Sequence, residues 1–460
     1  MLVKRRCALH VLLRMISLLY RIYRIQSSLL YFTSRRLLPM GTGLLITSLI
    51  SCVMMLGNPM RPLYQLCSLL LGIVMVAGIW VFFRRGKVRV SRVMAGHATA
   101  GVAFPYEVLV ENVGGDLPSA KLREGGADPR PDLLTFRQAR EPGERQRNLF
   151  DKVFAFYRWQ WLVEGGKLFD TQECEVFSLK KGESLRVAMT LEPRKRGVME
   201  LVDLRLLLPE PLGLFQRVRK TEGVASKLCV LPKRYAVPEF RLPGAARDQV
   251  GDDVTSRQFG QGGEFASLRE YRSGDSPRMM HWASWAKTGR PIVKELEEMI
   301  FPRYALVLDT FGEAGSEDRF EEAVSVAASF ASALDTDECM LDLLFLGDRD
   351  HVVSAGRGVA PGVVLLEALA SVKMGYEEKF DGLLRMTATH GKGITGCICV
   401  FHGWSESRDV FMRRLNAAGV PSRGFAIVQG GVNGEMSYQA LEDVDFLQSG
   451  KVGESLRKLR

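Results

Sequence analysis

The first 106 residues of this 460-residue chain contain no Asp or Glu. Fourteen of the 62 Lys and Arg residues lie there, so the rest of the chain carries 48 basic and 52 acidic residues and a net charge of −4. A dedicated nucleic-acid domain needs a concentrated basic face, which this mildly acidic remainder lacks. We therefore expect no nucleic-acid partner and assign the overall charge of +10 to the N-terminal segment.

Common signatures of catalysis and metal binding are also missing. The eight Cys form no CxxC pair, the six His form no HExxH, and neither a GxxxxGK[ST] phosphate loop nor a nucleophile elbow occurs. Cys397 and Cys399 alternate within an apolar strand pattern, so we expect reduced core cysteines, with a metal or disulfide role as the alternative. No metal and no cofactor are expected.

Two long apolar runs predict membrane spans. Leu37–Gly57 and Leu63–Phe83 are each 21 residues long and uncharged, enough to cross a hydrocarbon core of roughly 30 Å as helices. A short turn, NPMRP, joins them, and basic residues flank both outer ends. Residues 37–86 are therefore predicted to form a two-helix transmembrane hairpin, with both termini on the cytoplasmic side of a bacterial inner membrane. Buried core helices are the alternative.

The leader, residues 1–36, is basic. Polar and basic residues recur at steps of four and three, which places them on one helical face opposite Leu, Ile, Val and Tyr. Such a helix suits the headgroup region of an anionic leaflet, so membrane lipids are expected partners of the N-terminus. A disordered basic leader is the alternative. The residues on the polar face are His10, Arg14, Ser17, Arg21, Arg24 and Ser28.

Residues 87–230 have the pattern of β-strands. Alternating or apolar runs of strand length occur at 106–112, 185–193, 198–208 and 226–232, separated by Gly-rich turns. They predict a β-sandwich-like domain. The stretch near 124–170 begins polar and becomes aromatic, so we interpret it as an insertion that folds over the sandwich edge or touches the membrane. Its aromatic side chains are expected to serve packing.

Residues 303–450 alternate short apolar strands with helical patterns, which predicts an α/β domain with a mainly parallel sheet. Asp309 ends the first strand, where von Willebrand factor A domains begin a metal site with Asp-x-Ser-x-Ser. Here Phe311 and Glu313 occupy the two hydroxyl positions, so the oxygen ligand set of a Mg²⁺ site is not assembled. We interpret Asp309 as a degenerate remnant.

Residues 231–302 form a connector with a dense central stretch. Ser276 as N-cap, Pro277 and Gly289 predict one helix over 277–287 with Trp282 and Trp285 buried, followed by an edge strand. From Arg241 to Arg303 ten basic and nine acidic residues balance, which favours a network of ion pairs, and hence a structural clamp or docking surface.

An acid–base site in the same stretch is the alternative. His281 beside Glu264, Glu270 and Asp275 has the residue types that a hydrolase uses. No hydroxyl or thiol is clearly placed for nucleophilic attack, however, so no catalysis is expected.

The stretch LREYRSGDSPRMMHWASWAKTGRPIVKE resembles the signature of the bacterial domain of unknown function fifty-eight family, as do RGVMEL and PEPLGLF at lower specificity. Trp285 and Glu210 depart from it, since a small residue and Asp are usual there. The resemblance implies a von Willebrand A-like membrane protein that assists a MoxR-type AAA+ ATPase, alongside other von Willebrand A-like or transglutaminase-like membrane proteins.

Together these patterns predict a membrane-anchored, non-catalytic scaffold or adaptor, with an unrecognised hydrolase around His281 as the alternative. The residues expected to form the clamp or docking surface are Arg269, Glu270, Tyr271, Asp275, Arg278, His281, Trp282, Lys287, Arg290 and Glu295.

Overall fold

The computed structural model divides into two compact units, Met1–Leu231 and Pro232–Arg460, and each is described by itself. It describes residues 2–57, 61–94, 96–141, 143–238, 264–297, 303–312, 315–334, 339–346, 350–356, 361–375, 380–390, 394–429 and 443–458.

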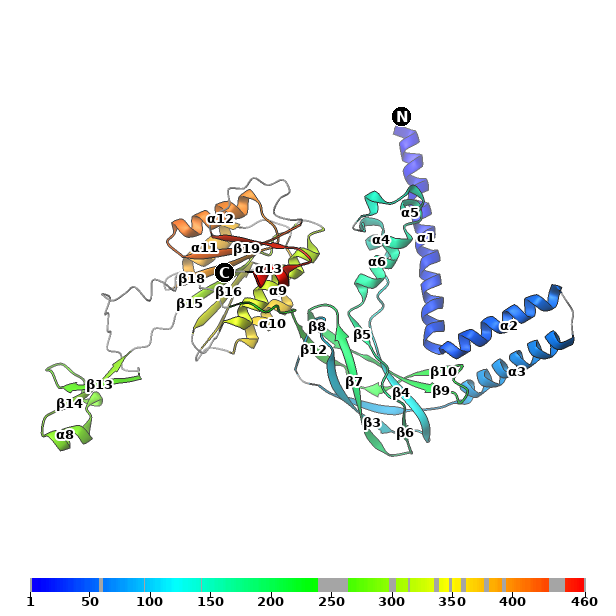
Figure 1. The fold of residues 1–460 in the computed structure, drawn as a ribbon, viewed down its shortest axis with the longest axis horizontal. Helices are drawn as coiled ribbons and strands as arrows, with labels where there is room; N and C mark the ends of the chain where they lie inside the picture. Colours follow the sequence, from blue (N-terminus) through cyan, green and yellow to red (C-terminus); the bar gives the residue numbers. More distant parts are fainter. Residues whose placement is uncertain are drawn as a thin grey trace. The chain divides into compact units, whose positions relative to one another are not determined.

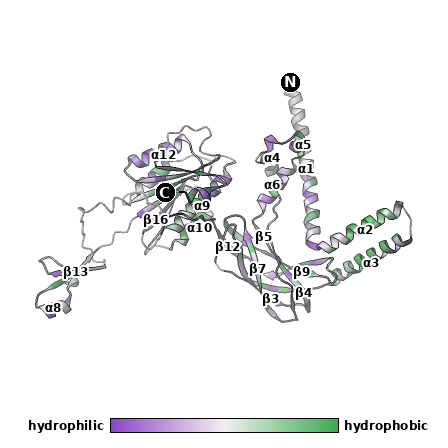
Figure 2. Ribbon diagram, in the orientation of Figure 1, coloured by the Kyte–Doolittle hydropathy of each residue, from purple (hydrophilic) through white to green (hydrophobic). Residues whose placement is uncertain are grey.

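Three long helices begin the first unit (Figure 1): α1 (Leu2–Arg36), α2 (Pro39–Gly57) and α3 (Arg61–Phe83). The break after α1 falls at Leu37 and Leu38, because the residue before a proline avoids the helical region and Pro39 suits the first position of the next helix. Arg35 and Arg36 end α1, where positive charge complements the helix dipole. Figure 2 shows the hydrophobic colour along α2 and α3, which pack against each other.

Among the described residues, one helix is long and apolar enough to cross a membrane. It is Pro62–Phe83 of α3, with 22 residues and a mean hydropathy of 2.6. The helix in the first predicted span, α2, begins at Pro39, because Leu37 forms a β-bridge with Phe215 instead of joining it. The apolar stretch of α2 with described side chains, Pro39–Met54, is shorter than the span test requires. The two-span arrangement stays a prediction.

Three sheets follow in the first unit. The five-stranded sheet has the order β11 (Glu222–Gly223), β1 (Val88–Val93), β3 (Phe104–Asn112), β7 (Ser184–Pro193), β5 (Phe169–Thr171). The four-stranded sheet has the order β10 (Gln216–Lys220), β9 (Asp203–Pro209), β4 (Leu117–Gly125), β6 (Phe177–Leu179). The three-stranded sheet has the order β2 (His97–Thr99), β12 (Ser226–Leu231), β8 (Gly197–Leu201).

These sheets share one hydrophobic core. Strict alternation in β3 sends Tyr106, Val108 and Val110 inward, where they meet Leu122 of β4 and Leu206 of β9. The predicted strand over 198–208 is divided in the structure, because the chain leaves β8 after Leu201 and enters a different sheet as β9.

The insertion between β4 and β5 is helical. It contains α4 (Leu133–Gln138), the 3₁₀ turn η1 (Glu144–Gln146), α5 (Leu149–Phe154) and α6 (Phe156–Gly166). Phe136 and Trp159 pack against Tyr20 and Tyr23 of α1, so these two insertion aromatics do serve packing. Part of the apolar face of the leader is thus covered by protein, whereas the sequence pattern had assigned it to lipid.

The second unit contains a six-stranded sheet in the order β17 (Asp350–Ala355), β16 (Met340–Leu346), β15 (Arg303–Leu308), β18 (Gly396–Phe401), β19 (Ser422–Val428), β20 (Val444–Gln448). All pairs are parallel except β16 with β17. Five helices accompany it: α9 (Glu317–Ala333), α10 (Val363–Ser371), α11 (Phe380–His390), α12 (Glu406–Ala417) and α13 (Val452–Leu456).

Helices cover both faces of this sheet (Figure 1). Phe330 of α9 packs on Phe425, while the next residue, Ala426, joins α11 and α12 in the opposite core. This two-sided burial explains why the strands are almost wholly apolar. Cys397 and Cys399 of β18 lie in the same core as thiols, with their Sγ atoms 3.6 Å apart, as the core reading of these two residues predicted.

Candidate functional site

The signature stretch forms an antiparallel hairpin within the second unit, here called the signature hairpin (residues 264–297). Strands β13 (Glu264–Glu270) and β14 (Ile292–Glu297) pair antiparallel, and the 3₁₀ turn η2 (Pro277–Met279) and helix α8 (Trp282–Thr288) lie between them. The prediction of one helix over 277–287 is wrong. Met280 forms a β-bridge with Val293 and the His281 N–H donates to Ile292 O (2.9 Å), which interrupts the helical hydrogen bonding.

The end of α8 follows the prediction. Gly289 takes the left-handed conformation, with φ of 69°, that glycine adopts without a Cβ penalty. The start does not: His281, and not Ser276, is the N-cap of α8, and its Nδ1 accepts from Ser284 N (3.3 Å).

A bidentate ion pair closes the turn of the signature hairpin. Arg269 Nη1 and Nη2 donate to the two carboxylate oxygens of Asp275 at 2.7 and 2.8 Å, and Arg272 N donates to the same carboxylate at 2.8 Å. The Arg269 hydrogen bonds, with the Arg272 backbone bond second, lower the pKa of Asp275 to about 2. These contacts fix the turn because they tie Asp275 to Arg269 at the end of β13 and to the Arg272 backbone.

A second pair, Arg290 Nη1 with Glu270 Oε1 at 2.9 Å, joins the two strands on the outside. Its side chains are 75% and 68% exposed, so it adds little stability and mainly orients the two groups. Tyr271 is held through its backbone, since its N–H donates to Pro291 O at 2.9 Å, while its side chain is exposed.

The predicted burial of Trp282 is wrong: its side chain is 63% exposed. Its ring stacks on Trp285, which is half-buried, with centroids 5.3 Å apart and an interplanar angle of 22°. Interruption of the predicted helix changes the direction of Trp282, because the helical phase now starts at His281. The exposed Trp282 ring and the Trp285 ring beneath it therefore form an aromatic surface that solvent can reach.

Three other predicted residues are not part of the pairing. Arg278 and Lys287 are exposed, and within the described residues neither forms a hydrogen bond or ion pair. Glu295 lies in β14 opposite Ser267, but its side chain is outside the described part of the structure. Among the described side chains of the signature hairpin, two ion pairs are present, Arg269 with Asp275 and Arg290 with Glu270.

His281 has one hydroxyl neighbour. Ser284 Oγ lies 2.6 Å from His281 Nδ1, in the same ring environment that caps α8. Among the described side chains no carboxylate contacts His281, so the Glu264–Glu270–Asp275 setting expected for acid–base chemistry is not assembled around it. The side chain of Glu264 itself lies outside the described residues.

Asp309 occupies a second polar site, here called the Asp309 cluster (Asp309, His402, Arg408). Asp309 is fully buried; it accepts from Phe311 N at 2.9 Å and from Arg408 Nε at 2.8 Å. Arg408 also donates to Phe311 O at 3.0 Å and to Ser405 Oγ at 3.0 Å. The Arg408 guanidinium thus supplies the positive charge beside the buried Asp309 carboxylate.

His402 completes the cluster, with Nε2 3.6 Å from Asp309 Oδ2 and no hydrogen bond to that nitrogen from the described residues. Burial, reinforced by the nearby Arg408 charge, lowers the pKa of His402 below its ordinary value, although Asp309 opposes the shift. Within the described residues, no group of three or more His, Cys, Asp or Glu is placed to hold a metal ion.

Sequence reasoning missed Arg408 and His402. A signal for Arg408 was present: with Phe411, Met412 and Leu415 it has the i, i+3, i+4, i+7 spacing of the buried face of α12. A charge on that face requires a buried counter-charge, and the nearby strand ends offer Asp309. His402 follows the apolar strand pattern of residues 396–401, but this position alone did not predict a contact with Asp309.

Residues 267–375 match the family model described as "Protein of unknown function DUF58". The match supports the DUF58 family. It begins in β13 and includes the whole turn of the signature hairpin, then extends to Gly375, which bridges Phe311 beside Asp309. His402 and Arg408 lie beyond the DUF58 match, so the two side chains that neighbour Asp309 come from outside it.

The solved structures that resemble this chain include three small domains. The CARDB domain of a Pyrococcus furiosus protein is 13% identical, with a TM-score of 0.16, over 32% of this chain and 96% of its own. A non-cellulosomal cohesin from Archaeoglobus fulgidus is 14% identical, with a TM-score of 0.15, over 32% and 91%. A cohesin module from a Clostridium perfringens glycoside hydrolase is 12% identical, with a TM-score of 0.15, over 32% and 98%.

These TM-scores carry no inference about fold or function. Among curated proteins, none matches the chain.

Proposed function

We propose that this protein is a membrane-anchored, non-catalytic adaptor whose signature hairpin docks a protein partner. The observation that carries the proposal is that the hairpin combines internal ion pairs with an exposed aromatic side chain. Four of its charged residues pair within the hairpin, Arg269 with Asp275 and Glu270 with Arg290, while the stacked indole of Trp282 faces solvent. Exposed Trp is typical of interface hot spots, and internal ion pairs keep such a surface in one geometry.

The partner class comes from the family resemblance alone. We propose a MoxR-type AAA+ ATPase, and we place the chain in a bacterial inner membrane with α2 and α3 as a two-span hairpin and both termini in the cytoplasm. The apolar length of α3 supports the anchor, and the Arg residues that flank α2 and α3 support the orientation.

We further propose that the 303–450 domain is a von Willebrand A-like domain that has exchanged its cation for a side chain. Arg408 supplies to Asp309 the positive charge that a divalent ion supplies elsewhere. Its hydrogen bonds to Phe311 O and Ser405 hold the surrounding loops together. A domain with this arrangement binds partners without metal regulation.

Affinity purification from gently solubilised membranes tests the adaptor role. The wild-type chain should recover the ATPase, and Trp282→Ala should reduce recovery at least tenfold, since hot-spot truncation costs about 2 kcal/mol or more. Trp161→Ala is the matched control, because Trp161 is also an exposed tryptophan, 42% accessible in α6. Recovery of the bait alone in repeated experiments, or equal loss in both variants, would contradict the proposal.

A hydrolase is the second candidate, favoured by the 2.6 Å contact between Ser284 Oγ and His281 Nδ1. It predicts that a fluorophosphonate probe labels Ser284 and that His281→Ala abolishes labelling while the fold stays intact. The adaptor proposal predicts no labelling. Mass spectrometry of the probe-treated, membrane-bound protein distinguishes the two.

A further inference from the structure

A basic cavity lies where the end of α1 meets β10, and no function described so far uses it. Its volume is about 350 Å³, within the range of about 300–1,000 Å³ typical of ligand sites. Six cationic side chains line it and no carboxylate does. They are Arg35, Arg36, Arg130, Arg205, Arg219 and Lys220.

Among the described residues, carboxylates form ion pairs with two of these cations. Asp128 pairs with Arg130 at 2.5 Å, and Asp203 pairs with Arg205. Within the described residues, Arg35, Arg36 and Arg219 form no ion pair, and the buried atoms Arg35 Nη1 and Arg219 Nε have no hydrogen-bond partner. Buried hydrogen-bond donors without partners are uncommon in proteins. The two free donors in this cavity therefore favour the binding of an anion that accepts hydrogen bonds.

The positive charges around the cavity also favour an anionic ligand. The pKa of the neighbouring Arg217 is lowered, first by burial and then by the charges of Arg219, Arg85 and Arg36. An anion placed among these groups would relieve their mutual repulsion.

The cavity adjoins the ends of the apolar helices. Arg36 ends α1 two residues before α2 begins, and Leu38 N donates to Leu214 O at 3.0 Å. Arg217 of β10 donates to Arg84 O at 2.9 Å and to Phe82 O, at the C-terminal end of α3. If α3 crosses the membrane, the cavity lies at the depth where the apolar span ends, which is the depth of lipid phosphates.

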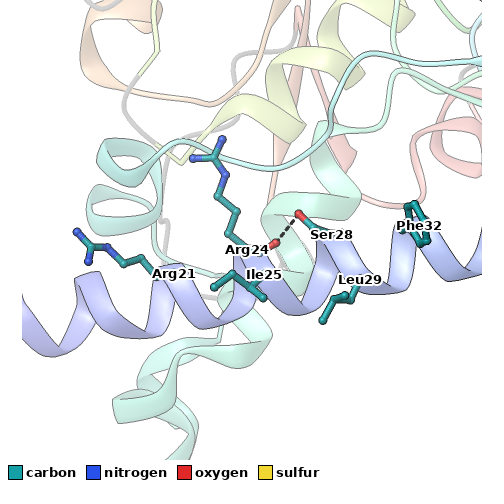
Figure 3. A pocket seen from close by; sticks show the side chains of 6 residues that line it. All are labelled: Arg21, Arg24, Ile25, Ser28, Leu29 and Phe32. Carbon is teal, nitrogen blue, oxygen red and sulfur yellow. Dashed lines mark hydrogen bonds between the residues drawn. The ribbon is translucent and has the colours of Figure 1, made fainter.

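An apolar stripe continues from the cavity along α1. Leu18, Ile22, Ile25, Leu29 and Phe32 recur at steps of four and three and are each 48–62% exposed. Figure 3 shows three of them beside Arg21, Arg24 and Ser28, around a second cavity of about 650 Å³ that shares Ser28 and Phe32 with the first. Adjacent phosphate-binding and apolar surfaces match the two chemical parts of a phospholipid.

We infer that this cavity binds the phosphate of an anionic phospholipid, whose acyl chains lie along the Ile25–Leu29–Phe32 stripe. The inference rests on the membrane anchoring in the proposed function but not on the adaptor role. A second copy of this helix is a poorer occupant, because residues 1–106 carry no acid and two such surfaces would repel.

Native mass spectrometry of the detergent-solubilised full chain tests the inference, with phosphatidylglycerol and phosphatidylcholine as probes. Phosphatidylglycerol should bind at least tenfold more tightly. Arg35→Gln with Arg219→Gln should weaken it about 25-fold, since each basic group near an anionic surface contributes about fivefold. Arg186→Gln with Lys227→Gln removes the same charge at exposed positions of β7 and β12, and should change affinity less than twofold.

Arg36→Gln with Lys220→Gln, both exposed, reports the same loss if the first pair fails to fold. Equal affinity for the two lipids, or unchanged phosphatidylglycerol binding in a folded cavity variant, overturns the inference. So does saturation by inorganic phosphate at the same concentrations, which assigns the cavity to free phosphate. Loss of a dimer on Ile25→Gln, with lipid binding unchanged, assigns the stripe to a second copy.

Carbonate extraction of native membranes distinguishes a failure of the membrane anchoring from a failure of the lipid site. Release of the full chain into the supernatant overturns the anchoring in the proposed function. An anchored chain without selectivity for anionic lipid overturns only the lipid site.

Discussion

At the scale of single residues, two Arg–Asp ion pairs fix local geometry in this protein. Arg269 holds Asp275 in the signature hairpin, and Arg408 holds Asp309 in the α/β unit. The first pair is partly exposed and local in sequence, while the second is buried and joins residues 99 positions apart. Their removal should therefore have different consequences.

We expect NMR titration of Asp275 to give a midpoint at about pH 2, and Arg269→Gln to return it towards the ordinary value of about 3.9. Because the folded-state pKa is lowered, the ion pair contributes fully above the unfolded value of about 3.9. Its contribution is lost as the pH falls towards 2. Arg278→Gln removes a nearby charge that makes no such contact and serves as the control. A wild-type midpoint near 3.9 would contradict the pairing.

Asp309→Asn should destabilise the α/β unit by about 3–5 kcal/mol, since it leaves the Arg408 guanidinium buried without a counter-charge. Asp309→Leu combined with Arg408→Met should cost less than either single substitution, because no uncompensated charge remains. Urea unfolding of the three variants measures the difference. Additive losses in the double variant would show that the two side chains do not act as a pair.

At the scale of elements, helices and strands are joined by a few close contacts. The turn after β9 is one: the Glu210 carboxylate accepts from Leu212 N at 2.6 Å and from Leu214 N at 2.5 Å. A Cβ on Gly41 of α2 would lie 2.1 Å from Leu214 O, so only glycine permits this approach. The PEPLGLF motif, with Glu210 in place of the usual Asp, thus holds α2 against the β-sheet unit.

The packing of the insertion on α1 is a second such contact. Trp159→Ala should destabilise that cluster by about 3–5 kcal/mol, because Trp159 is 5% exposed and contacts Tyr20, Tyr23 and Phe136. Hydrogen exchange should accelerate in α4–α6 and spare the β-sheets. Trp161→Ala, at an exposed position of the same helix, should leave exchange unchanged. Equal protection in wild type and Trp159→Ala would mean that the aromatic cluster does not hold the insertion.

At the scale of the whole molecule, the first of the two units carries the apolar helices α2 and α3. The full chain should remain in the pellet after alkaline carbonate extraction, while a fragment of residues 87–460 should enter the supernatant. The physical reason is the loss of α3, the one described helix that passes the length and composition test for a span. Immunoblotting of both fractions measures it, and pelleting of the fragment would show that another surface holds the membrane.

The sequence alone determined elements whose signals are local. Alternation over 106–112 predicted β3, and the helical spacing over 318–334 predicted α9, because periodic burial of one face leaves a pattern in neighbouring residues. Gly289 predicted the end of α8 for the same reason, because the left-handed conformation of a C-cap glycine depends on residues next to it in the chain.

Only the tertiary structure decided what depends on distant partners. Met280 meets Val293 across the signature hairpin, which breaks the predicted helix and exposes Trp282. β17, β20 and α11 were not predicted, because their short patterns acquire meaning only beside the central sheet. The same holds for Arg408 at Asp309 and for the basic cavity at the end of α1, because folding brings together charges that lie far apart in the sequence.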